Sequence, residues 1–67
     1  MIATWTQLVD GSWGVRVQGV ARPGSIVVVR FKDAREPSRE IVRKVLAVRE
    51  QDGQTISICS IERETAP

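Results

Sequence analysis

The chain has 67 residues, with 10 basic and 8 acidic side chains, one cysteine and no histidine. That length allows a single domain with a small core, so the fold will be only marginally stable. One cysteine excludes an intramolecular disulfide, and the lack of histidine leaves no Cys/His set for a structural zinc. Hydrophobic residues make up 42% and charged residues 27%, a balance typical of a folded protein and not of a disordered one.

The sequence contains no segment that resembles a membrane span or an export signal. The longest apolar runs have four residues, as at Ile26–Val29, far shorter than the roughly 20 residues of a membrane helix. Residues 1–5 have no basic segment followed by an apolar one, so we expect no signal peptide. Together with the lone cysteine, these features predict a cytoplasmic protein that does not bind a membrane.

The first third of the chain predicts a β-hairpin. Apolar and polar residues alternate from Trp13 to Gln18, which is the period of a half-buried strand. A second β-rich run, residues 4–9, precedes it. The turn Asp10-Gly11-Ser12 lies between the two runs, and a short Asp-Gly turn between strands is typical of a hairpin.

A third strand is expected over residues 25–32, after a turn at Arg22-Pro23-Gly24. Its first half, residues 26–29, is apolar at every position, so we expect both of its faces to be covered. Phe31 follows in line with Val27 and Val29. A polar loop over residues 33–38 ends the strand.

The segment that starts at Ser38 fits two structures. The spacing of its apolar residues permits a helix over residues 39–50, with Ser38 as its cap. Its Val and Ile content, and the Asp52-Gly53 turn that joins it to the next strand, favour a strand in a second hairpin. We favour the strand, and the alternative fold is α+β.

The last expected strand covers residues 54–61. It places Ile56 and Ile58 on one face and Cys59 and Ile61 on the other, and a bulge near Cys59 would reconcile the two patterns. Five short strands with Gly-rich turns predict an all-β fold, a small five-stranded barrel over residues 1–62 with a disordered tail at 63–67. A core this small favours a homo-oligomer.

Several of these motifs together resemble a group of short, mostly uncharacterised proteins from phages and mobile elements. They are a DGSWG hairpin at Asp10–Gly14, the run at 23–28, the strand at 42–46 and a closing DG-x-x-I-S-I-C-S-I strand at 52–61. The resemblance implies an all-β fold and a phage or nucleic-acid setting. The chain departs from the group's pattern at Arg43 and Ala47, where the group has a small and an aromatic residue.

The residue types that support catalysis are scarce. Nucleophilic catalysis usually needs a histidine base, which is absent. Cys59 lies among isoleucines, where a buried thiol is expected. Asp10, Asp33 and Asp52 all fall in turns, where aspartate bonds to its own backbone. We find no metal-ligand spacing and no phosphate-binding glycine motif. We therefore expect no enzyme, no cofactor and no metal.

Charge distribution favours a nucleic-acid ligand. Residues 16–49 hold nine basic and three acidic side chains, and small barrels bind nucleic acid through basic groups on phosphates and aromatic rings on bases. We expect Trp13 and Phe31 in the core and leave Trp5 open between core and surface. The candidate binding residues are Arg16, Arg30, Lys32, Arg35, Arg39, Arg43, Lys44 and Trp5.

The competing hypothesis is a protein-interaction or homo-oligomerisation module. Arginine-rich surfaces bind carboxylates as well as phosphates, so a phage accessory protein of this kind would also suit an acidic partner protein.

Overall fold

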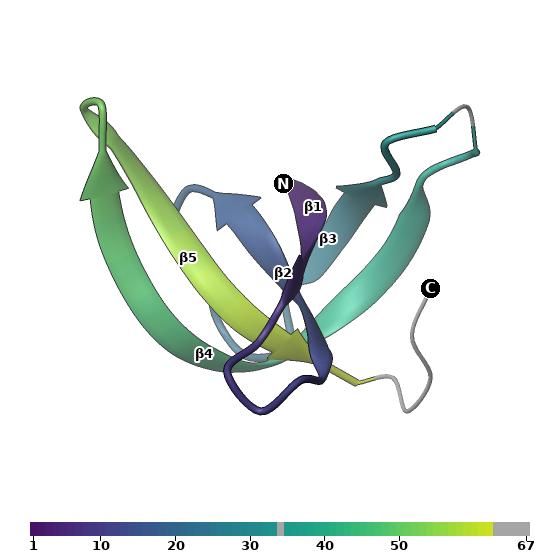
Figure 1. The fold of residues 1–67 in the computed structure, drawn as a ribbon. Helices are drawn as coiled ribbons and strands as arrows, with labels where there is room; N and C mark the ends of the chain where they lie inside the picture. Colours follow the sequence, from purple (N-terminus) through teal and green to yellow (C-terminus); the bar gives the residue numbers. More distant parts are fainter. Residues whose placement is uncertain (34, 63–67) are drawn as a thin grey trace.

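The structure, a computed structural model, describes residues 1–33 and 35–62. The described residues form five strands (Figure 1). They contain no helix long and apolar enough to cross a membrane. The all-β prediction is confirmed, and the segment 39–50 belongs to a strand and not to a helix. The expected tail at 63–67 lies outside the described residues. The strands are β1 (Ile2–Gln7), β2 (Trp13–Gln18), β3 (Ile26–Arg30), β4 (Ser38–Gln51) and β5 (Gln54–Ile61).

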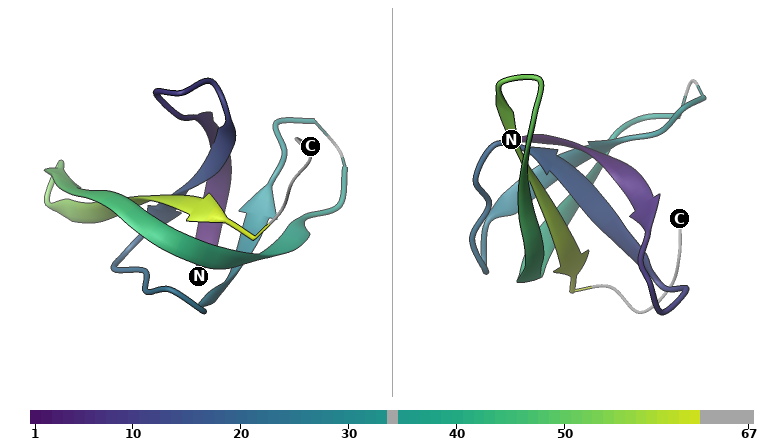
Figure 2. Two further views of the ribbon diagram at one scale, coloured as in Figure 1. Left: turned by 90° about the horizontal axis from the view of Figure 1, so that it is seen from below. Right: turned by 60° about the vertical axis from the view of Figure 1, so that its left-hand side comes forward.

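The strands form one sheet that closes into a barrel in the order β1-β2-β5-β4-β3 (Figure 2). Four of the five strand pairs are antiparallel. The fifth is parallel and joins β1 to β3 over three residue pairs, from Ile2 opposite Val28 to Thr4 opposite Arg30. This short parallel pairing is the seam that closes the ring, because β1 and β3 are the ends of the strand order.

The turns have the backbone geometry that their residues predict. Asp52 and Gly53 both have positive φ, 52° and 77°, as a two-residue type I′ turn requires between two strands. At the turn before β3, Gly24 has φ +89°, and the Ser25 N–H donates to the Arg22 carbonyl at 3.0 Å. Both turns were predicted from the sequence.

The interior of the barrel is built mainly from valines at alternate strand positions. Val15 and Val17 of β2, Val27 and Val29 of β3, and Val42 of β4 are completely buried. Cys59 and Ile61 of β5 complete this layer, with Ala3 and Ala21. The period of two that the sequence showed in β2 therefore identifies the inward face of that strand correctly.

A buried serine attaches the β2–β3 loop to the sheet. The Ser57 hydroxyl donates to the Gly19 carbonyl at 2.6 Å and accepts from the Ala21 N–H at 3.2 Å. Both loop groups are thereby satisfied without water, as buried polar groups require. Ala21 is only 4% exposed and joins the core from the loop.

The irregular pairing that the sequence suggested near Cys59 occurs in the neighbouring strand. The β4–β5 register shifts between Val42 and Lys44 and again between Val45 and Ala47, and Val45 between these shifts pairs with Cys59. The extra residues thus belong to β4, and bulges increase the local bend of a strand. β4 is the longest strand and curves around the others (Figure 1).

Two expectations about burial were wrong. Trp13 is 42% exposed, although it was expected in the core. The outer face of β3 is not covered, since Ile26 is 61% exposed and Val28 only half-buried. Trp13 does have the inward parity of Val15 and Val17, but it is the first residue of β2 and lies beyond the closed layer. The alternation of apolar and polar residues predicts which face of the sheet a side chain lies on. It does not predict whether other residues cover that side chain.

Gly14 supplies the sharpest test of this packing. A β-carbon at Gly14 would overlap the Cys59 carbonyl oxygen and lie 2.8 Å from Leu8 Cδ2. The carbonyl belongs to the backbone of β5 and cannot rotate away. We expect Gly14→Ala to lower the free energy of unfolding by about 2–3 kcal/mol, measured by urea unfolding followed by circular dichroism.

The matched control is Gln18→Ala, which changes an exposed side chain on the same face of β2. It should change the free energy of unfolding by no more than about 0.5 kcal/mol. Equal stability of the Gly14→Ala variant and the parent would show that β2 and β5 do not approach as described.

Candidate functional site

A pocket opens at the point where β1 and β3 separate. Their pairing ends at Thr4 and Arg30. Beyond it β1 continues into its hairpin with β2, while the chain after β3 leads into the β3–β4 loop, which extends away from that hairpin (Figures 1 and 2). The space between them has a volume of about 700 Å³. Its lining residues are Thr4, Trp5, Trp13, Arg30, Phe31, Lys32, Asp33 and Arg35.

All three aromatic side chains of the protein line this pocket. Trp5 and Phe31 are half-buried, and their ring centroids lie 5.9 Å apart with the planes tilted by 42°. Trp5 also packs against the buried core. Trp13, opposite Gln7 at the end of the hairpin, is the most exposed of the three. Each ring has the same parity as the inward-facing residues of its strand. The rings lie at the end of the barrel, where inward-facing side chains line an opening.

Arg35 lies over Phe31 and is held there by Asp33. Its guanidinium carbon is 4.5 Å from the centroid of the Phe31 ring, a cation–π distance. The Arg35 Nε donates to both carboxylate oxygens of Asp33, at 3.2 and 3.0 Å, and Nη2 lies 2.9 Å from Oδ2. The Arg35 backbone N–H donates to Oδ1 at 2.9 Å. These hydrogen bonds lower the pKa of Asp33 and raise that of Arg35.

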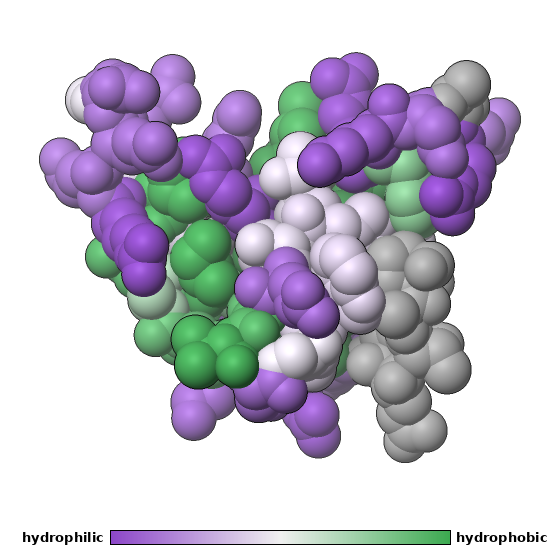
Figure 3. All heavy atoms as spheres, in the orientation of Figure 1, coloured by the Kyte–Doolittle hydropathy of each residue, from purple (hydrophilic) through white to green (hydrophobic). Residues whose placement is uncertain are grey.

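Two further cations stand at the same opening. Arg30 is the last residue of β3 and Lys32 follows two positions later, and both are exposed. Within the described residues, neither side chain forms a hydrogen bond or an ion pair. Because the Asp33 carboxylate balances Arg35, Arg30 and Lys32 carry the net positive charge of the pocket. Hydrophilic residues cover the β3–β4 loop beside it (Figure 3).

The structure brings together half of the binding residues predicted from the sequence. Arg30, Lys32, Arg35 and Trp5 line the pocket. The other four lie elsewhere on the barrel. Arg16 pairs with Thr4 on the outer face and donates to Gln51 Oε1 at 2.9 Å; Arg39 is exposed on β4 opposite Val28; and Arg43 and Lys44 are exposed at the first irregularity of β4.

Four pocket residues, Thr4 among them, were not among the predicted site residues. Trp13 and Phe31 were assigned to the core from their parity, and Asp33 to a turn. A signal was present for the two rings, since each stands at the boundary between a strand and a Gly- or charge-containing turn. Such positions lie at the ends of a sheet, where an inward side chain is not enclosed.

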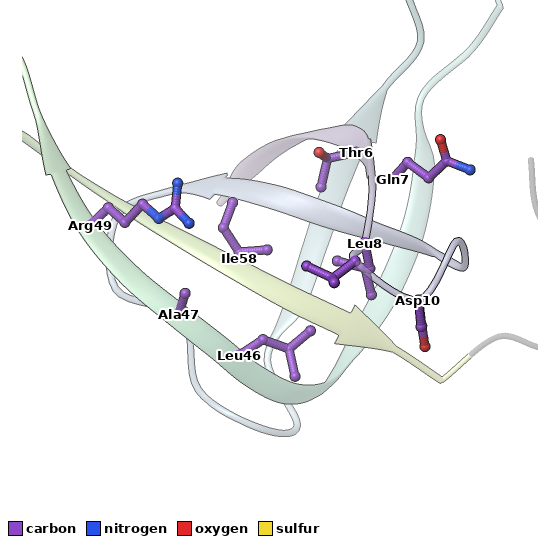
Figure 4. A pocket seen from close by; sticks show the side chains of 9 residues that line it. Thr6, Gln7, Leu8, Asp10, Leu46, Ala47, Arg49 and Ile58 are labelled. Atoms are coloured by element: carbon purple, nitrogen blue, oxygen red, sulfur yellow. The ribbon is translucent and has the colours of Figure 1, made fainter.

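A second, smaller concavity lies on the outer face of the sheet, where the β1–β2 loop approaches β4 and β5. It has a volume of about 530 Å³. Leu8, Leu46 and Ile58 point into the same space, with Arg49 and Asp10 at its margins (Figure 4). Apolar surface also covers β4 and β5 in this region (Figure 3). This apolar groove brings together neither several basic groups nor an aromatic ring.

The one thiol of the chain lies in the core. Cys59 is completely buried, as the sequence predicted, and burial raises the pKa of its thiol. Residues 1–33 and 35–62 contain no group of three or more Cys, Asp and Glu side chains that could hold a metal ion. The pocket itself holds aromatic surface, cations and one paired carboxylate.

Comparison with known proteins identifies no relative. No family model, no curated protein and no solved structure matches the chain. The resemblance to short phage and mobile-element proteins stays a prediction from sequence motifs.

The ion pair between Asp33 and Arg35 predicts how the Asp33 carboxyl titrates. The pKa of Asp33 lies below its usual value because Arg35 donates to the carboxylate. The contact is therefore complete above the ordinary pKa of aspartate and is lost as the pH falls through the lowered one. We expect Arg35→Ala to return the Asp33 pKa towards its ordinary value, measured by NMR titration of the carboxyl carbon.

Asp10 is the internal control for this titration. Its pKa is also lowered, chiefly because the Ser12 hydroxyl donates to its carboxylate at 2.6 Å. It should not respond to Arg35→Ala. Parallel shifts of both carboxyls would indicate a general change of the protein, and an unchanged Asp33 would contradict the ion pair.

Proposed function

We propose that this protein binds nucleic acid without catalysis and that the pocket between β1–β2 and the β3–β4 loop is its contact site. The observation that carries the proposal is the gathering of every aromatic ring of the chain beside three cations, Arg30, Lys32 and Arg35. Residues far apart in the sequence contribute to it, from β1, β2, the end of β3 and the loop after it. Phosphates and bases are the ligand groups that this pair of chemistries suits best.

The phosphate contacts fall to the two cations without partners among the described residues. Arg30 and Lys32 are exposed, so a phosphate can approach them without displacing a protein contact. Arg35 already shares its charge with Asp33 and adds less to the attraction. Binding that depends on a few such contacts is sensitive to salt, because each phosphate neutralised releases counterions.

This proposal predicts that the affinity for nucleic acid falls modestly with salt, by an amount set by the number of phosphate contacts. Two phosphate contacts, one to Arg30 and one to Lys32, correspond to a loss of roughly sevenfold in affinity for a single strand between about 50 and about 200 mM salt. Arg30→Gln or Lys32→Gln should weaken binding equally for all sequences and reduce the salt slope by about 1. Fluorescence anisotropy with labelled oligonucleotides measures both quantities.

Arg22→Gln is the matched control, since it removes the same charge at an exposed position outside the pocket. Equal weakening by Arg22→Gln and Lys32→Gln would mean that net charge alone drives the association. No binding of any oligonucleotide at about 50 mM salt would refute the proposal.

A second candidate function is self-association through the outer face of β1, β3 and β4. Four apolar side chains are neighbours there through strand pairing: Ile2 lies opposite Val28, and Ile26 opposite Ile41. Ile2, Ile26 and Ile41 are 49%, 61% and 42% exposed. Contiguous exposed apolar surface is typical of interaction sites, and a second copy of this chain would offer the same surface in return.

Self-association predicts a mass that depends on protein concentration. We expect Ile26→Asp to reduce the association constant by at least about tenfold, because it places a charge in an apolar contact, measured by sedimentation velocity. The control is Val48→Asp, which changes a 56% exposed residue paired with the inward Ser57 on the other face of the sheet. A monomer at all concentrations would exclude this candidate.

A further inference from the structure

Two of the three rings in the pocket are recessed, whereas Trp13 is 42% exposed. Trp5 and Phe31 are half-buried in this pocket, to which the β1–β2 hairpin also contributes Trp13 and the β3–β4 loop contributes Lys32, Asp33 and Arg35. A ligand group must enter the opening to contact these rings. A flat surface of exposed rings would accept any macromolecule, whereas a recess of about 700 Å³ selects by shape.

Bases in a duplex cannot enter such a recess. Each base in a double helix is covered on both faces by its neighbours, so it must leave the stack before a protein ring can contact it. An unpaired base has free faces and a flexible backbone, and stacking on aromatic side chains is the usual way in which proteins bind it. The shape of the pocket therefore favours single strands.

The contacts within the pocket indicate which surface receives the base. Phe31 already contacts the Arg35 guanidinium and lies 5.9 Å from Trp5. Trp5 is also packed on the core. Trp13 has no such ring neighbour among the described residues and is 42% exposed. It is therefore the ring with the most surface available, with the guanidinium plane of Arg35 as a second stacking surface in the same pocket.

The paired carboxylate bears on sequence preference. Both oxygens of Asp33 accept hydrogen bonds from Arg35. Asp33 is thus committed to a protein partner, and so are the Nε and Nη2 groups of Arg35 that face it. Stacking on a ring is a contact that every base supports, so it favours no particular sequence.

We infer that the ligand is single-stranded nucleic acid and that one unpaired base of any sequence stacks on Trp13 in this pocket while the flanking phosphates contact Arg30 and Lys32. The inference rests on the proposed function, and it adds the strandedness of the ligand and the residue that receives the base. Trp13 thus acts as a binding residue and is not part of the core.

The test compares single and double strands with the ring present and absent. Fluorescein-labelled oligothymidine and oligouridine of about 12 nucleotides, and a DNA hairpin duplex of similar charge, are titrated with the protein at low salt. We expect tighter binding of both single strands than of the duplex, with quenching of tryptophan fluorescence. Trp13→Ala should weaken single-strand binding at least about fivefold and leave duplex binding unchanged.

Trp13→Phe keeps a ring at this position and controls for the fold. It should retain most of the affinity for single strands, and circular dichroism should show the same β-sheet spectrum for parent, Trp13→Ala and Trp13→Phe. Loss of affinity in both variants alike would contradict stacking as the role of Trp13.

The possible failures are distinguishable. Equal binding of duplex and single strands, or an unchanged affinity of Trp13→Ala for the oligothymidine, overturns the inference and leaves nucleic-acid binding by charge intact. Failure of every oligonucleotide to bind overturns the proposed function, and the inference with it.

Discussion

The parallel pairing of β1 with β3 is the contact on which the rest of the structure depends. It joins the two ends of the strand order, and without it the five strands would form an open sheet. Only three residue pairs make the contact. Its formation encloses the valine core, and its early end creates the pocket. One short seam thus accounts for both the closed part of the barrel and the open part.

The core that this seam encloses is made of small side chains. Its completely buried members are valines, a cysteine and a serine, which lets strands of a narrow barrel approach closely. Close packing is also evident in two features beside this core. Gly14 has no room for a β-carbon between Leu8 and the Cys59 carbonyl, and Ser57 reaches the backbone of the β2–β3 loop with both hydrogen-bonding functions of its hydroxyl. A 67-residue chain can bury little surface, so precise packing of small groups matters more here than in a larger domain.

The pocket follows from the same geometry. Trp5, Trp13 and Phe31 are too large for a layer of valines, and they stand where that layer ends. Charge accumulates beside them because the chain leaves β3 through a polar loop with basic residues. Arg35 and Asp33 order part of this loop against Phe31. Aromatic surface, cations and an entrance therefore coincide at the one end of the barrel where β1 and β3 diverge.

The sequence by itself determined the strands, the turns and the facing of the side chains, because these depend on contacts between near neighbours. Alternation from Trp13 to Gln18 indicated which residues face inward, and the Asp52-Gly53 turn favoured a strand over a helix for the segment before it, which the structure confirms. The candidate site was half predicted, since basic residues and Trp5 are visible in the sequence but their grouping is not.

Only the tertiary structure decided at which residue of each strand the inward-facing side chains cease to be enclosed by the barrel. Trp13 and Val15 have the same parity, yet one is 42% exposed and the other completely buried. The difference depends on how far β1 and β3 stay paired, and the residues of that seam are more than twenty positions apart in the chain. Local pattern carries no information about such a distance. The same closure places Arg30, Lys32 and Arg35 beside the rings. The other predicted basic residues lie on other parts of the surface: Arg16, Arg39, Arg43 and Lys44.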